Sequence, residues 1–67
     1  MTKVERVELE STLEEIEAAI DEYSAILVGL TDKPRAAALL IDALNLEISN
    51  AGRIRYQLDQ AEKADED

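Results

Sequence analysis

The sequence predicts an all-α fold: an antiparallel two-helix hairpin, coiled-coil-like, that assembles into a four-helix bundle or a higher oligomer. Apolar residues recur at alternating steps of four and three in both halves of the chain, as in packed helices. One cluster of helix-breaking residues separates the halves. Because a chain of 67 residues rarely buries enough apolar surface on its own, we assign residues 1–67 to a single hairpin that is completed by self-association.

The first helix is expected to run from about residue 3 to residue 30. Thr2 and Glu5 fit a capping box, in which an N-cap hydroxyl and an acid three residues later satisfy free backbone amides. The apolar seam that follows is unbroken over three heptads. It consists of Leu9, Leu13, Ile16, Ile20, Tyr23, Leu27 and Leu30.

Residues 29–34 contain the stop and restart signals that predict a turn at about residues 31–33. Gly29 is typical of a helix end, and Asp32 is a candidate N-cap for the next helix. Pro34 then lies in the first helical turn, where its missing N–H costs nothing. The break is too short to link two domains and indicates the turn of an αα-hairpin.

The second helix is expected from about residue 34 to residue 61, and we expect the acidic tail, residues 62–67, to fray. Its seam is predicted at Ala37, Ile41, Leu44, Ile48, Ala51, Arg55 and Leu58. Gly52 lies inside this helix and marks a close approach of two backbones, a kink or a helix end. Arg55 on the seam is expected to form a partly buried ion pair with Glu8 or Glu10, and the alternative is an arginine that binds a ligand.

A lone hairpin leaves one side of its seam open to water, and a four-helix bundle would cover it. Leu40 and Ile54 flank the second seam, and Leu39, Ala43 and Leu46 form a further apolar stripe. We interpret Leu39 and Leu46 as candidate partner contacts. The predicted interface residues are Leu9, Leu13, Ile16, Ile20, Tyr23, Leu27, Ile41, Leu44, Ile48 and Leu58.

The chain carries a net charge of −9, which disfavours direct binding to nucleic acid or to anionic membranes. Residues 8–22 contain seven acids and no base, on the outer positions of the first helix. Solvation alone accounts for such a face. The alternative is a docking surface for a basic protein, and its candidate contacts are Glu14, Glu15, Asp21 and Glu22. The expected partners are therefore a second copy of the chain and a basic protein.

Histidine and cysteine, the residues most used for catalysis and metal binding, are absent. We expect no catalytic residues, no metal and no cofactor. Glu14 and Glu17 form an E-x-x-E pair that resembles the Mg²⁺-binding pairs of all-helical nucleotide pyrophosphohydrolases, but the second helix has no matching E-x-x-D. This pair keeps a magnesium-dependent hydrolase as a remote alternative.

The leading hypothesis is a non-enzymatic, oligomeric protein-interaction module: an adaptor, regulator or assembly factor. Small acidic helical proteins of this kind are frequent among phage and mobile-element products. The alternative is an acidic decoy that occupies the nucleic-acid site of a basic protein. The N-terminus does not resemble a signal peptide, and the longest near-apolar run, residues 36–41, is too short to cross a bilayer. We therefore expect a cytoplasmic location.

Overall fold

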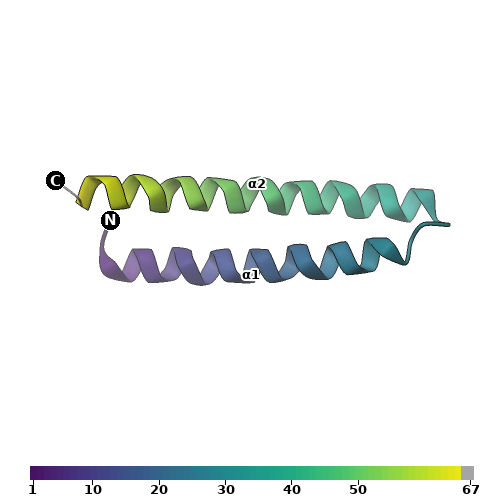
Figure 1. Ribbon diagram of the computed structural model, residues 1–67, viewed down its shortest axis with the longest axis horizontal. Coiled ribbons are helices and arrows are strands. Elements are labelled where there is room, and N and C mark those ends of the chain that lie inside the picture. The colour runs from purple at the N-terminus through teal and green to yellow at the C-terminus, as the bar shows by residue number, and fades with distance from the viewer. Residues whose placement is uncertain (66–67) are drawn as a thin grey trace.

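The computed structural model describes residues 1–65 and consists of two antiparallel helices joined by a short turn (Figure 1). Helix α1 spans Lys3–Val28 and helix α2 spans Pro34–Asp65. They form a rod of 53 × 15 × 12 Å, in which the N-terminus and the last turn of α2 lie at the end opposite the turn. The all-α helical hairpin predicted from the sequence is confirmed.

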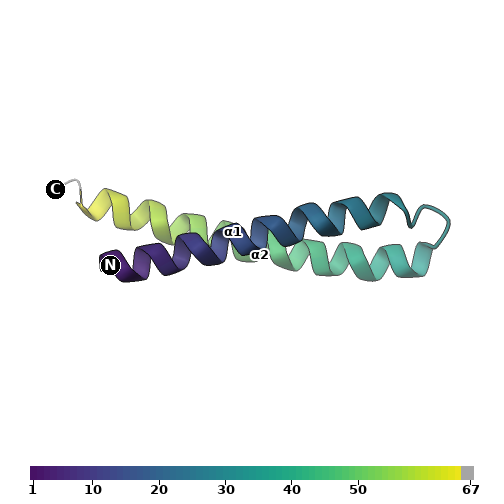
Figure 2. The ribbon, with the colours of Figure 1, turned by 90° about the horizontal axis from the view of Figure 1, so that it is seen from below.

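The two helices wrap around each other instead of running strictly parallel. Seen from below, α1 crosses α2 near the middle of the rod (Figure 2). A small crossing angle is expected of helices whose apolar residues repeat every 3.5 positions, because it keeps both seams in contact along their length.

Thr2 is the N-cap of α1, as the sequence predicts. Its backbone is extended, with φ −78° and ψ 163°. Its hydroxyl accepts a hydrogen bond from the Glu5 backbone N–H at 3.2 Å and donates one to Glu5 Oε1 at 3.1 Å. The Glu5 carboxylate therefore returns to the cap hydroxyl, and the two side chains fix the first turn of the helix.

The end of α1 lies at Val28, two residues before the end expected from the sequence. The backbone N–H groups of Gly29 and Leu30 donate to carbonyls three residues back, those of Ile26 and Leu27, at 2.9 and 3.0 Å. Such tight final turns satisfy carbonyls that the helix would otherwise leave free.

Helix α2 begins at Pro34, as expected, but the residue that precedes it as N-cap is not the expected one. The Lys33 backbone N–H closes a turn onto the Leu30 carbonyl at 3.0 Å, and the Lys33 carbonyl accepts the first helical bond from Ala37 at 2.9 Å. Lys33 therefore occupies the position before the helix that the sequence assigned to Asp32. Pro34 is the first helical residue, where its fixed φ suits a helix start.

The predicted seam of α1 faces α2, since all seven of its residues are half-buried. On α2, the structure retains Ala37, Leu44, Ala51 and Leu58 of the predicted seam and replaces its other three residues. Ile41 and Ile48 are 42% and 49% exposed, and Arg55 is also exposed. The half-buried or buried positions that alternate along the seam are Ala37, Leu40, Leu44, Glu47, Ala51, Ile54, Leu58 and Ala61.

Helix α2 could turn either the predicted seam or the observed seam toward α1, and both seams contain Ala51 and the residues one and two heptads away from it. The predicted seam adds Ile41, Ile48 and Arg55 to these shared positions, and the observed seam adds Leu40, Glu47 and Ile54. Each set has two large apolar residues and one charged residue, so apolar content favours neither seam. The observed rotation leaves Glu47 half-buried and keeps Arg55 exposed at the rim of the seam, where a guanidinium keeps its hydration.

The interior of this hairpin is very small. Within residues 1–65, Ala51 is the one buried hydrophobic residue, at 1% exposure, and α1 contains no buried residue. All other seam side chains are only half-covered by the opposite helix. Two helices alone thus leave the seam accessible from both sides.

Helix α2 continues through Gly52 and reaches Asp65, beyond the end expected at residue 61. A Cβ added at Gly52 would meet nothing within 4 Å, so the glycine does not mark a close approach of the two backbones. An ion pair at 3.4 Å between Lys63 and Asp59, one turn apart, supports the last turns. Of the tail expected to fray, residues 66–67 lie outside the described residues.

Candidate interaction surfaces

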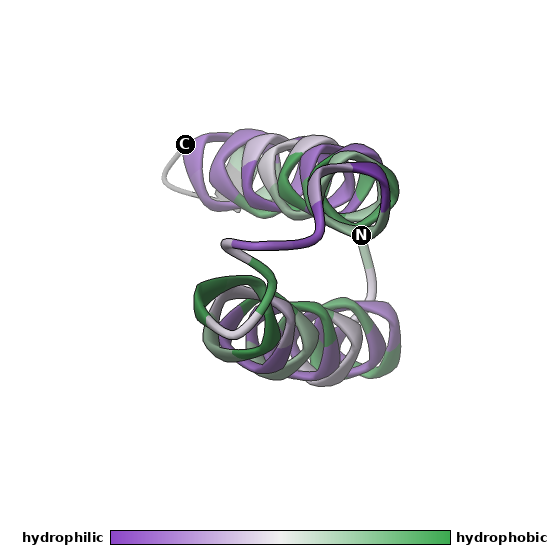
Figure 3. Ribbon diagram, turned by 90° about the vertical axis from the view of Figure 1, so that its right-hand side faces the viewer, coloured by the Kyte–Doolittle hydropathy of each residue, from purple (hydrophilic) through white to green (hydrophobic). Residues whose placement is uncertain are grey.

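The stripe predicted on α2 is exposed in the hairpin. Leu39 is 68% exposed and Leu46 is 60% exposed, with the smaller Ala43 half-buried between them. Steps of four and three residues place all three on one side of α2. Viewed from the turn end, hydrophobic residues also colour the outer sides of the nearest helical turns (Figure 3).

Ile26 of α1 lies on the same side of the hairpin as this stripe. Thr12 of α1 and Asn50 of α2 line the same hollow, so these two residues lie on the same side of the hairpin. Steps of seven residues lead along this side from Thr12 to Ile26, and from Asn50 to Ala43. Ile26 is 53% exposed. We call the surface formed by Ile26, Leu39, Ala43 and Leu46 the leucine face.

The opposite side of the seam contains an ion pair between the helices. Arg55 Nη2 lies 3.4 Å from Glu17 Oε1, and the two side chains are 56% and 49% exposed. The partner expected for Arg55 near the open end, Glu8 or Glu10, is therefore replaced by Glu17. Ile41 and Ile48 belong to this second side, two heptads and one heptad before Arg55 respectively, and form a smaller apolar surface there.

The acids of α1 are presented to solvent, as the sequence suggested. All seven acids between residues 8 and 22 are exposed. Glu17 is held by Arg55, while the candidate partner contacts Glu14, Glu15, Asp21 and Glu22 project from the outer surface of α1. This arrangement creates a one-sided negative surface along the N-terminal two-thirds of the helix.

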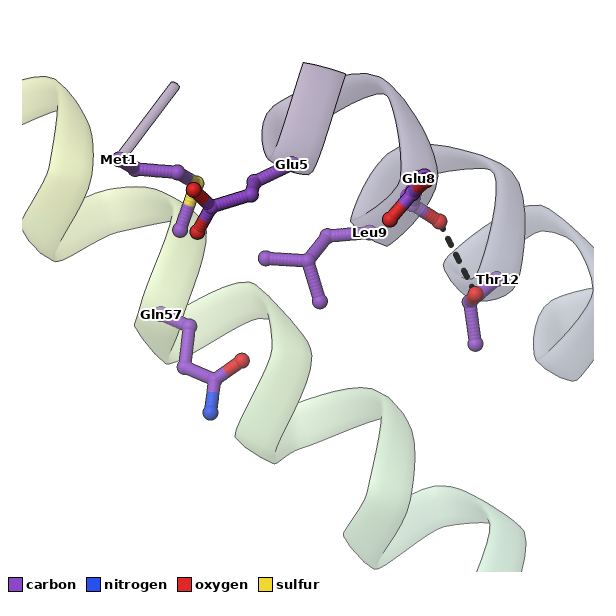
Figure 4. A pocket seen from close by; sticks show the side chains of 6 residues that line it. All are labelled: Met1, Glu5, Glu8, Leu9, Thr12 and Gln57. Carbon is purple, nitrogen blue, oxygen red and sulfur yellow. Dashed lines mark hydrogen bonds between the residues drawn. The ribbon is translucent and has the colours of Figure 1, made fainter. Parts of the chain in front are cut away.

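A hollow at the open end of the rod brings Met1 of the N-terminus, four residues of α1 and Gln57 of α2 together (Figure 4). Leu9 and the Met1 thioether approach the α2 side of the hollow, while Glu5 and Glu8 lie along its rim. The Thr12 hydroxyl donates to the Glu8 carbonyl at 2.9 Å, so its donor is already used. The hollow is open to solvent and suits packing against another surface better than enclosure of a small molecule.

Glu14 and Glu17, the pair considered for a magnesium-dependent hydrolase, are not joined by further acidic side chains of the described chain that could bind a metal ion. Glu17 is engaged by Arg55, and Glu14 is exposed to solvent. Within residues 1–65, no group of three acidic side chains is placed so that it could hold a metal ion.

The chain matches no protein-family model, no curated protein and no solved structure. The molecule itself must therefore supply any functional argument. In the part of the chain that the structure describes, neither helix has the length and apolar character needed to cross a bilayer.

One functional feature escaped the sequence reasoning, which treated the two helices separately. Segment 23–46, which forms the turn half of the hairpin, contains two acids and two bases and has no net charge. The whole charge of −9 therefore belongs to the rest of the chain. The signal was present in the sequence, but it emerges only when residues on both sides of the turn are counted as one end of a rod.

Proposed function

We propose that the chain is a non-enzymatic protein-interaction module that acts as a homo-oligomer. The observation that carries this proposal is the contrast, within the described part of the chain, between one buried residue and many exposed apolar ones. Large hydrophobic side chains on both helices are between 42% and 74% exposed. Exposed apolar surface on this scale, in a chain with so little interior, favours burial against another protein chain.

The residue types present also favour binding over chemistry. The sequence contains no histidine and no cysteine, and each serine lies on a helix without a base beside it that could activate it. Adaptor, regulator and assembly roles need shape and surface chemistry alone, which a rigid helical rod supplies.

Light scattering across a dilution series tests the proposal. We expect a dimer or a higher homo-oligomer at micromolar concentration, with dissociation and loss of helicity on dilution. A helical monomer at every concentration would contradict self-association. Glu14→Lys, which changes charge outside the leucine face, is the matched control for Leu39→Lys: the latter should weaken assembly and the former should not.

A second candidate function is an acidic decoy for the nucleic-acid site of a basic protein, and the exposed acids of α1 favour it. Replacing Glu14, Glu15, Asp21 and Glu22 with lysine should abolish displacement of a DNA-binding protein from a DNA column. The control reverses four exposed acids elsewhere: Asp32, Asp42, Asp59 and Glu62. If both variants lose displacement equally, net charge alone explains the displacement, and a specific decoy surface on α1 is rejected.

A further inference from the structure

The hairpin exposes more surface than a compact monomer of its mass. Its accessible area is 5143 Å², whereas a folded monomer of 7.4 kDa is expected to expose about 4,200 Å². The difference of roughly 900 Å² is close to the ~800 Å² that each partner buries in a standard interface. A single second copy of this chain is therefore enough to cover the excess.

The leucine face sets the register of such a pair. A two-fold axis beside Ala43 places Leu39 next to the partner's Leu46, and Leu46 next to the partner's Leu39, as a self-complementary contact requires. On α1, Ile16 lies across from Asn50 in a shared hollow, so Ala43 lies across from about residue 23. The same axis then sets Ile26 against the partner's Ala19, a large residue against a small one.

We infer that two copies of the chain pair antiparallel through the leucine face about a two-fold axis beside Ala43, so that the open ends of the two hairpins project in opposite directions. This inference rests on the proposed self-association and deepens it, because it names the surface and the geometry of the contact.

The register also brings opposite charges together at each turn. Arg53 and the partner's Asp32 both lie about ten residues from the axis and so at the same level of the rod. Glu15 and the partner's Lys33 lie at nearly equal distances from the axis on the α1 side.

Introduced cysteines test the contact, because the natural chain has none. Ala43→Cys should form an intermolecular disulfide under mild oxidation, since packed helices bring residues at a two-fold axis within disulfide reach. Ala38→Cys is the matched control: it also replaces an alanine of α2, on the other side of the helix. We expect about tenfold less disulfide from the control, because its Cα atoms lie outside bonding range.

Leu39→Cys and Leu46→Cys provide a test of the register. A mixture of the two variants, one of them labelled with ¹⁵N, should give the mixed disulfide in preference to either symmetric one, as read by intact mass. Preference for the symmetric Leu39→Cys product would contradict the register. In the natural chain, small-angle scattering should give a maximum dimension of roughly 80 Å for two offset rods, each 53 Å long.

The outcomes separate this inference from the proposed function. A dimer that is no longer than one hairpin, or that cross-links at Ala38→Cys as strongly as at Ala43→Cys, overturns the geometry but leaves self-association intact. A monomer in light scattering overturns both. A monomer that binds neutral phospholipid vesicles through the leucine face would assign that face to a lipid surface and also overturn the inference.

Discussion

Gly52 and Ala51 are neighbours in the middle of α2, and the structure predicts opposite changes in stability for Gly52→Ala and Ala51→Gly. A Cβ added at Gly52 meets nothing within 4 Å, and no glycine of the described chain has a positive φ. Gly52→Ala therefore adds a methyl group to open helix surface without strain. Because alanine favours a helix interior over glycine by about 1 kcal/mol, the free energy of unfolding should rise by about that amount.

Ala51→Gly should destabilise the protein by more than Gly52→Ala stabilises it. The variant loses the same helix preference, about 1 kcal/mol. It also loses a methyl group from the one buried hydrophobic position among residues 1–65, which contributes about a further 1 kcal/mol. We therefore expect Ala51→Gly to lower the free energy of unfolding by about 2 kcal/mol.

Thermal unfolding followed by far-ultraviolet circular dichroism measures both effects. For a domain of this size, 1 kcal/mol shifts Tm by about 4–8 °C, so Gly52→Ala should raise Tm by about 6 °C and Ala51→Gly should lower it by about twice as much. All proteins must be compared at one concentration, because the Tm of an assembling protein depends on it. A lower Tm for Gly52→Ala would refute the reasoning, since it would mean that another backbone packs against the glycine.

Three further substitutions test the cap, the seam and the ion pair. Thr2→Ala should cost about 1 kcal/mol of stability and lower Tm, while Thr2→Ser, which keeps the hydroxyl, should not. Glu47→Leu should raise the free energy of unfolding in urea by about 1 kcal/mol through added apolar burial, and a lower value would reveal a required carboxylate contact. Glu17→Gln should cost less than about 1 kcal/mol, because both partners of the ion pair with Arg55 are about half-exposed; a loss that survives 1 M salt would argue against a screened ion pair.

The seam of α1 could be predicted because its sequence offers a single solution. The positions that flank Ile16 and its heptad relatives on one side are polar: Glu10, Glu17 and Ser24. Rotating the helix toward them would exchange apolar for polar burial. Periodicity and the hydrophobic effect therefore agree on one orientation, and the structure has it.

The seam of α2 could not be fixed in the same way. Ile41 and Ile48 compete with Leu40 and Ile54 around a shared set of alanine and leucine positions, and each choice adds one charged residue. The decision depends on a contact between the helices, in which Arg55 reaches Glu17. Such a contact follows from the relative rotation of both helices, which the pattern of one helix does not contain.

The candidate surfaces also differ in whether the sequence of one helix is enough to predict them. Spacing within one helix predicted the exposed Leu39 and Leu46 and the outward acids of α1, because these depend only on the helical period. The association of Ile26 with Leu39 on one side depends on how α1 and α2 are set against each other, and it became visible only in the folded hairpin.

Because the hairpin has almost no interior, the stability of the folded protein should depend on its own concentration. Ala51 is the one fully buried residue of the described chain, so a solitary hairpin would have little margin against unfolding. Each copy that binds adds stability in proportion to the logarithm of concentration. Folding would then act as a threshold on expression: below it the chain stays open to proteolysis, and above it the protein accumulates.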